Sequence, residues 1–115
     1  MKPNRIYLLE KDGVTLGQIT IDDIEMFAFH GSFEPTPEYE NYRALFEEDS
    51  SIFHQMNEFG ETEELTDKNI EFVEKIVSLG LTLRRVGGGI YRQAIISIDG
   101  HRAGFRPLDP EEEPL

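Results

Sequence analysis

The chain has 115 residues and a formal net charge of −12, from 23 acidic against 11 basic side chains. This charge argues against nonspecific binding to nucleic acid and against docking on an anionic membrane. The absence of cysteine excludes disulfides, thiolate catalysis and thiolate zinc sites. With no apolar run of membrane-spanning length and no signal-peptide pattern, the sequence predicts a soluble, cytoplasmic protein.

Charge is divided unevenly along the chain. Residues 36–80 are strongly acidic, whereas residues 81–108 carry a group of arginines and a single acid, Asp99. One interpretation is that the acidic middle and the basic end attract each other within the fold. The alternative is a surface that binds an anion or an acidic partner, and its candidate residues are Arg84, Arg85, Arg92, Arg102 and Arg106.

The first third of the chain is typical of β-strands. Residues 5–10 and 14–21 are rich in aliphatic and β-branched side chains and flank a Lys-Asp-Gly turn, which predicts a hairpin. The aromatic-rich segment at residues 26–30 is either a third strand or a packed loop, and both alternatives remain open.

Residues 35–60 predict a long helix. Thr36 is a candidate N-cap, and Gly60 is suited to end the helix. Apolar side chains recur at intervals of three and four along one face: Tyr39, Tyr42, Leu45, Phe46, Ile52, Phe53, Met56 and Phe59. Because so broad a face must be covered, the sequence predicts that it packs on a sheet and that Phe46 and Phe53 are buried.

A second helix is predicted from Thr66 to Gly80, followed by strands at residues 81–86 and 90–98. Asp99 and Gly100 predict a tight hairpin. Its register places Tyr91 and Ile95 on the outer face. The covered face then holds Ala94, Ile96, Ile98, Ala103 and Phe105.

The predicted element order is ββ(β)ααβββ. It corresponds to a single α+β domain over residues 1–108, with an antiparallel sheet of about five strands and two helices packed on one face. Residues 109–115 are acidic and interrupted by proline, which predicts a flexible tail.

Asp49 interrupts the apolar stripe of the first helix, where an unpaired carboxylate is costly. In a structural interpretation, the carboxylate pairs with an arginine of the C-terminal strands, with Arg84, Arg85 and Arg92 as the favoured partners. In a functional interpretation, Asp49 is an acid or base with a raised pKa in a cleft between helix and sheet. The sequence favours the structural interpretation and leaves both open.

His30, next to Gly31 and Ser32, is a further candidate for binding a ligand or partner. No strand-turn-helix motif surrounds Ser32, so we predict no catalytic residue. His54 and Glu58 share one side of the long helix, but that side lies opposite the apolar stripe. It is therefore typical of a solvated face, and the sequence predicts neither a metal site nor a cofactor.

No motif identifies a reaction, a ligand or a family. The leading hypothesis is a small acidic, noncatalytic module that binds another protein, as an inhibitor, antitoxin or immunity protein does, and its charge favours a basic partner. A second hypothesis is an enzyme or small-ligand protein with a pocket near Asp49 and residues 27–33. A third is a homodimer joined through sheet edges or through the side that carries Tyr91 and Ile95.

Overall fold

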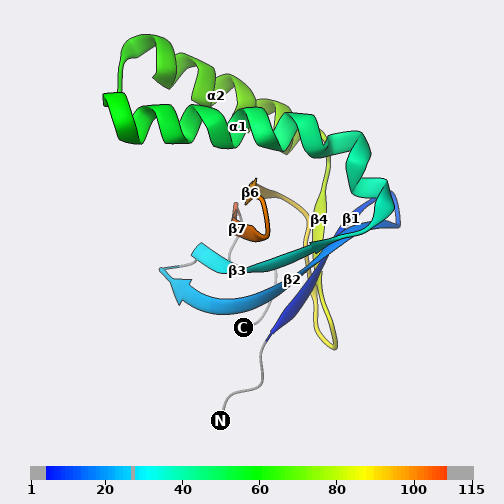
Figure 1. Cartoon of the computed structure of the whole chain (residues 1–115). Coiled ribbons are helices and arrows are strands. Elements are labelled where there is room, and N and C mark those ends of the chain that lie inside the picture. Colours follow the sequence, from blue (N-terminus) through cyan, green and yellow to red (C-terminus); the bar gives the residue numbers. More distant parts are fainter. Residues whose placement is uncertain (1–4, 27, 109–115) are drawn as a thin grey trace.

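The computed structural model describes residues 5–26 and 28–108 (Figure 1). Its strands are β1 (Ile6–Lys11), β2 (Val14–Glu25), β3 (Ala28–Pro35), β4 (Thr82–Arg85), β5 (Ile90–Tyr91), β6 (Ala94–Asp99) and β7 (Arg102–Pro107). A 3₁₀ turn, η1 (Pro37–Tyr39), precedes α1 (Glu40–Phe59), and α2 (Glu63–Ser78) follows. The α+β class with two helices is confirmed, whereas the predicted number of about five strands is too low.

All seven strands form one antiparallel sheet in the order β5-β4-β1-β2-β3-β7-β6. Of the two alternatives for the aromatic-rich segment, the structure shows the strand: it forms β3, which pairs with both β2 and β7. The segment predicted as one strand over residues 90–98 is divided into β5 and β6, with Arg92 and Gln93 between them. This division allows the two strands to pair with different neighbours at opposite edges of the sheet.

The division at Arg92 and Gln93 also corrects the predicted position of Tyr91. Its side chain is buried, with 1% of its surface exposed, instead of lying on the outer face with Ile95. The strict alternation of faces used for the prediction applies only within a continuous strand, and it is lost where the chain bends.

The sheet is curled around a group of aromatic rings. Tyr7 on β1 lies 6.1 Å from Tyr91 on β5 and 5.0 Å from Phe105 on β7, measured between ring centroids. Phe29 on β3 stacks on Phe105 at 4.9 Å. Because β5 and β7 belong to opposite ends of the strand order, these contacts hold the ends of the sheet toward each other.

The hairpin of β6 and β7 has the predicted register. Asp99 pairs with Arg102 around a two-residue turn, and Gly100 occupies the left-handed region with φ of 62°, which suits glycine. The side chains predicted to lie on the covered face are all buried: Ala94, Ile96, Ile98, Ala103 and Phe105.

Helix α1 ends at Gly60 as predicted, with φ of 87° at that residue. The predicted cap at Thr36 is wrong, because its hydroxyl donates to the backbone carbonyl of Thr15, with 2.7 Å between the oxygens, and caps no helical amide. This bond attaches the start of the helical segment to β2. The predicted burial of the apolar stripe holds for Phe46, which is fully buried, and fails for Phe53, which is 58% exposed.

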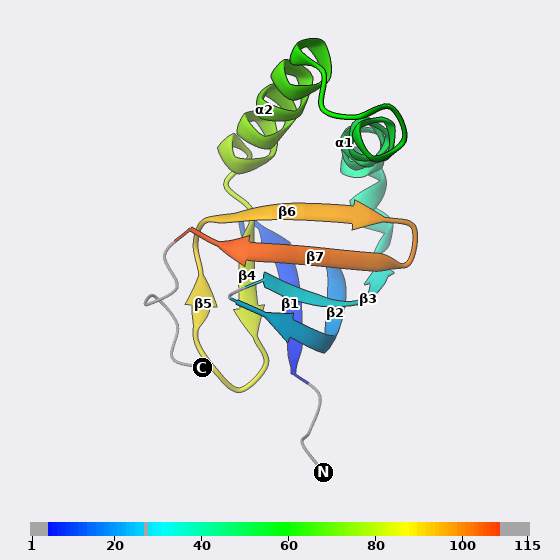
Figure 2. The same ribbon diagram turned by 90° about the vertical axis from the view of Figure 1, so that its left-hand side faces the viewer.

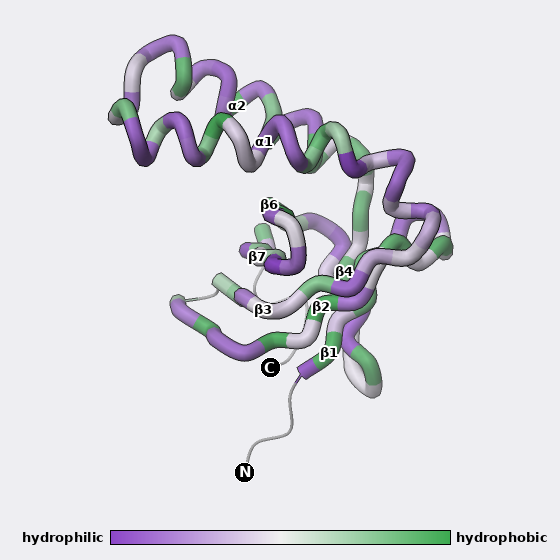
Figure 3. Tube along the Cα trace, in the orientation of Figure 1, coloured by the Kyte–Doolittle hydropathy of each residue, from purple (hydrophilic) through white to green (hydrophobic). Residues whose placement is uncertain are grey.

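Helix α2 begins earlier than predicted, because Thr62 supplies the cap by accepting a hydrogen bond from the backbone N–H of Leu65. Figures 1 and 2 show α1 and α2 side by side above β6, with the loop between them directed away from the sheet. The two helices therefore lie on the same side, over one edge strand. Along both helices, hydrophilic positions alternate with hydrophobic ones (Figure 3).

Two findings concern the ends of the chain and the membrane. The predicted tail at residues 109–115 lies outside the described residues. Within the described residues, neither helix combines the length and the apolar composition that crossing a membrane requires.

We predict that Phe46→Ala lowers the free energy of unfolding by about 3 to 5 kcal/mol, because it leaves a cavity in the core. Phe53→Ala is expected to cost less than about 1 kcal/mol, because more than half of that side chain is already in water. Both values are measured by denaturant unfolding. Equal losses for the two variants would contradict the observed position of α1.

Candidate binding groove

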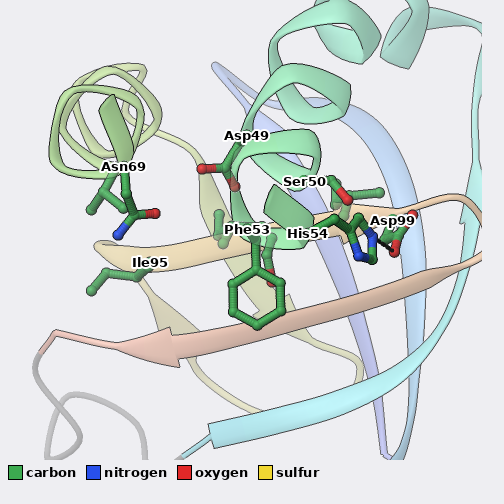
Figure 4. A pocket seen from close by; sticks show the side chains of 11 residues that line it. Asp49, Ser50, Phe53, His54, Asn69, Ile95 and Asp99 are labelled. Carbon is green, nitrogen blue, oxygen red and sulfur yellow. Dashed lines mark hydrogen bonds and ion pairs between the residues drawn. The ribbon is translucent and has the colours of Figure 1, made fainter. Parts of the chain in front are cut away.

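A groove runs between the two helices and strand β6 (Figure 4). It encloses a cavity of about 440 Å³. Its walls come from α1 and α2, and its floor is β6. The lining residues are Asp49, Ser50, Phe53, His54, Asn69, Val73 and the five residues from Ile95 to Asp99.

The floor of the groove is the free edge of β6. This strand is the last in the sheet order and pairs only with β7 within the described residues. Consecutive residues of β6 line the groove, although their side chains alternate between two faces, so the strand meets the groove edge-on.

The ladder between β6 and β7 determines which backbone groups face the groove. Asp99 and Arg102 close the turn, and hydrogen-bonded and non-hydrogen-bonded pairs alternate from there. The N–H and C=O groups of Ile96 and Ile98 therefore point away from β7, toward the helices. Both residues are buried, at 1% and 2% exposure, so the two helices cover these groups.

Asp49 lies on the wall that α1 contributes, and only 7% of its surface is exposed. Its carboxylate is directed from α1 into the space beside Asn69 of α2 (Figure 4). Within residues 5–26 and 28–108, no hydrogen bond or ion pair to this carboxylate is found. Burial raises its pKa above the ordinary range, because removal from water disfavours the charged form.

His54 and Asp99 close one end of the groove. Nε2 of His54 lies 2.8 Å from Oδ2 of Asp99, which joins α1 to the end of β6 (Figure 4). A smaller hollow of about 340 Å³ continues beyond this pair and reaches Gly100. The side chains of both residues are more than half exposed to solvent, so their contact spans the mouth of the groove without filling it.

The structure places the predicted arginine sites away from Asp49, so the predicted pairing of Asp49 with Arg84, Arg85 or Arg92 is wrong. Arg84 donates two hydrogen bonds to Glu10 on β1, at 3.0 and 2.8 Å. Arg102 donates two to Asp22 on β2, at 2.5 and 3.0 Å. These partners are strand acids, so attraction between the C-terminal arginines and the acidic helices does not explain these two residues.

The two ion pairs lower the pKa of both acids. The hydrogen bonds from Arg84 hold the pKa of the Glu10 carboxyl below its usual value, and those from Arg102 do the same for Asp22. Glu10 is buried, at 8% exposure, so Arg84 neutralises a carboxylate inside the sheet. Arg84 and Arg102 therefore have structural partners of their own.

The other predicted site residues also lie outside the groove. Arg106 is exposed on β7 opposite Ile95, and Arg92 lies in the connection between β5 and β6. His30 is on β3, paired in register with Asp23 on β2 and Gly104 on β7.

The pocket predicted near residues 27–33 lies elsewhere. Phe29 and Phe33 are 1% exposed and belong to the core, and residue 27 is outside the described residues. Of the predicted binding residues, only Asp49 lines the groove.

Sequence reasoning missed the remaining groove residues for identifiable reasons. The solvated face predicted for His54 agrees with its exposure, but its contact with Asp99 joins two elements 45 residues apart in the sequence. The free edge of β6 depends on the strand order, which no local pattern reveals. In the described residues, no group of three His, Cys, Asp or Glu side chains is arranged to hold a metal ion.

The chain matches no protein-family model, and neither the curated proteins nor the solved structures give a match. The groove is therefore interpreted from its own geometry.

We predict that Arg84→Met lowers the denaturant midpoint at pH 7, because Glu10 then loses the cation that stabilises its charged form. Since the pKa of Glu10 is lowered in the folded state, this contribution is present above the unfolded pKa of about 4.3 and is lost as the pH falls through the folded value. Unfolding at pH 7 and pH 3 tests this. A difference from wild type that does not shrink at pH 3 would contradict the role of Glu10.

We predict that Asp49→Asn stabilises the protein at pH 7 by about 1 kcal/mol, because it removes an unpaired buried charge. Burial raises the folded-state pKa, so the penalty is largest above that value and disappears as the pH falls toward the unfolded pKa of about 3.9. The free energy of unfolding of both proteins, measured between pH 8 and pH 4, should converge at low pH. A variant less stable than wild type at pH 7 would indicate a cation partner for Asp49.

Proposed function

We propose that this protein is a small, noncatalytic binding module that recognises a basic partner protein through the groove between α1, α2 and β6. The observation that carries the proposal is the lining of that groove, where the exposed apolar side chains of Phe53 and Ile95 lie beside the acids Asp49 and Asp99. Such a module would act as an inhibitor, antitoxin or immunity protein. The proposal places this protein in the cytoplasm.

The apolar lining of the groove supports recognition of a protein. Apolar side chains come from all three elements, with Phe53 from α1, Val73 from α2 and Ile95 from β6, and those of Phe53 and Ile95 are exposed. Exposed apolar side chains of this kind mark contact sites when they are gathered in one place.

The charge of the protein supports a basic partner. The chain carries a net charge of −12, and no lysine or arginine in the described part of the chain lines the groove, whereas Asp49 and Asp99 do. Attraction between opposite charges accelerates the encounter of two proteins, and this attraction weakens as salt is added. A basic partner is therefore attracted before it makes contact and meets acids where it docks.

A second candidate function is binding of a small molecule, with or without catalysis. The observation that favours it is a buried carboxylate with raised pKa in a cavity of about 440 Å³, which is within the ordinary size of ligand pockets. It differs from the first candidate in where the ligand lies. A small molecule occupies the cavity itself, whereas a protein also contacts exposed side chains at its rim, such as Phe53 and His54.

We predict that Phe53→Lys abolishes partner binding, because the substitution places a cation in the groove where a basic partner must dock. Phe59→Lys is the matched control, since Phe59 is an exposed phenylalanine on the same helix and is not among the groove residues. A partner captured by wild type is purified, and its affinity for all three proteins is measured by titration calorimetry. Binding kinetics at two salt concentrations report the electrostatic contribution.

The expected result is loss of binding for Phe53→Lys, retention for Phe59→Lys and an association rate that falls with salt. Equal binding by both variants would place the interface elsewhere. A small molecule that binds wild type in place of any protein, and is lost with Phe53→Lys, would favour the second candidate.

A further inference from the structure

We propose that the cavity between α1, α2 and β6 binds a small organic amine, whose ammonium group pairs with Asp49 and whose apolar body packs against Phe53 and Ile95. This inference rests on the second candidate function, binding of a small molecule, and names the class of ligand.

The first step concerns the charge of the ligand. The carboxylate of Asp49 is directed into the cavity and is 7% exposed, while none of the described residues gives it a hydrogen bond or an opposite charge (Figure 4). A buried carboxylate without a partner is unfavourable, and pairing with a cation removes that cost. Because the pair forms where water has limited access, its charge-assisted hydrogen bonds are strong.

The second step concerns access and size. Neither oxygen of the Asp49 carboxylate is among the fully enclosed, unpaired side-chain atoms of the described residues. A ligand in the cavity can therefore reach this carboxylate. The cavity of about 440 Å³ has the ordinary size of a small-molecule site, so it accommodates an amine with an aromatic or branched aliphatic body.

The third step concerns the surroundings of the ammonium group. Asn69 of α2 lies across the cavity from Asp49, and the oxygen of its side-chain amide is a second acceptor for the N–H groups (Figure 4). Phe53 follows Asp49 by one turn of α1, so both side chains lie on the same side of the helix (Figure 4). The face of an aromatic ring attracts a cation, which adds to the pairing with Asp49.

The fourth step concerns the body of the ligand. The apolar side chains of Phe53, Val73 and Ile95 line the cavity from three different elements. Phe53 is 58% exposed and Ile95 is 37% exposed, so an apolar ligand removes part of their surface from water. An ammonium group without an apolar body lacks this contribution.

The fifth step concerns ligands of other charge. An anion is disfavoured, because Asp49 and Asp99 line the cavity and no lysine or arginine in the described part of the chain does. A neutral apolar molecule would leave Asp49 without a partner. Asp99 is already in contact with His54 at the mouth of the groove, so Asp49 is the acid that pairs with the amine.

The test compares three compounds that separate the charge of the ligand from its apolar body. Phenethylamine carries both, phenethyl alcohol has a similar shape without the charge, and methylamine has the charge without the ring. Each compound is titrated at pH 7 into isotopically labelled wild type, Asp49→Asn and Glu48→Gln, and binding is followed by amide NMR. The spectrum of each variant also shows whether it is folded. Glu48 is an exposed acid of α1 that is not among the groove residues, so Glu48→Gln is the control for the change in net charge.

The expected result is that phenethylamine shifts the amides of lining residues such as Asn69 and Ile96. It should bind Asp49→Asn about tenfold more weakly than the other two proteins, as expected for the loss of one charged hydrogen-bonded pair. Phenethyl alcohol should bind wild type more weakly than phenethylamine does, and Asp49→Asn should not weaken its binding further.

Equal affinity of phenethylamine for wild type and Asp49→Asn, or no binding up to about 10 mM, overturns the proposal. Binding of methylamine as tightly as phenethylamine overturns the role of the apolar body.

These outcomes are separable from failure of the two candidate functions. Phenethyl alcohol that shifts the lining amides and binds as tightly as phenethylamine leaves the small-molecule site standing and removes only the amine. If no compound shifts these amides and a purified partner protein depends on Phe53, the small-molecule site is removed and the first candidate stands.

Discussion

The contact between aromatic rings from β1, β3, β5 and β7 is the interaction on which the rest of the structure depends. Tyr7 and Phe105 are 5.0 Å apart between centroids, and Phe29 stacks on Phe105 at 4.9 Å. Large rings that meet edge-to-face and in stacks bury much apolar surface from widely separated strands. Their packing fixes the curl of the sheet, because a flat sheet would keep β5 and β7 far apart.

The curl determines what happens at β6. The chain leaves β5 after Tyr91, bends at Arg92 and Gln93 and enters β6 at the opposite edge of the sheet. Both β6 and the helices then have to be accommodated on the same side of the molecule (Figure 2). Helices α1 and α2 cover this edge without pairing with it, since helical backbones have no free groups for a ladder. An edge that helices cover cannot pair with another chain, which protects the protein against aggregation.

The charge arrangement divides the acids into two groups with different physical roles. Glu10 is held by Arg84 of the neighbouring strand β4 and Asp22 by Arg102 of β7, beyond β3, which lowers the pKa of each carboxyl. Asp49 has no such partner in the described residues, and burial raises its pKa. Arginines of the sheet thus satisfy Glu10 and Asp22, whereas Asp49 in the groove has no such cation among the described residues. A fold that keeps a local electrostatic cost at one site is typical of binding and catalytic sites.

The sequence by itself determined the α+β class, the two helices, the turn at Gly100 and the buried face of the last hairpin, because each follows from periodicity or turn chemistry within a few residues. It also located Asp49 as a carboxylate in an apolar stripe, and its burial is confirmed. Only the tertiary structure decided the strand order, the burial of Tyr91, the exposure of Phe53 and the partners of the arginines. Each of these depends on contacts between residues that are far apart in the sequence. The packing of the curled sheet determines these contacts, and local sequence preferences do not.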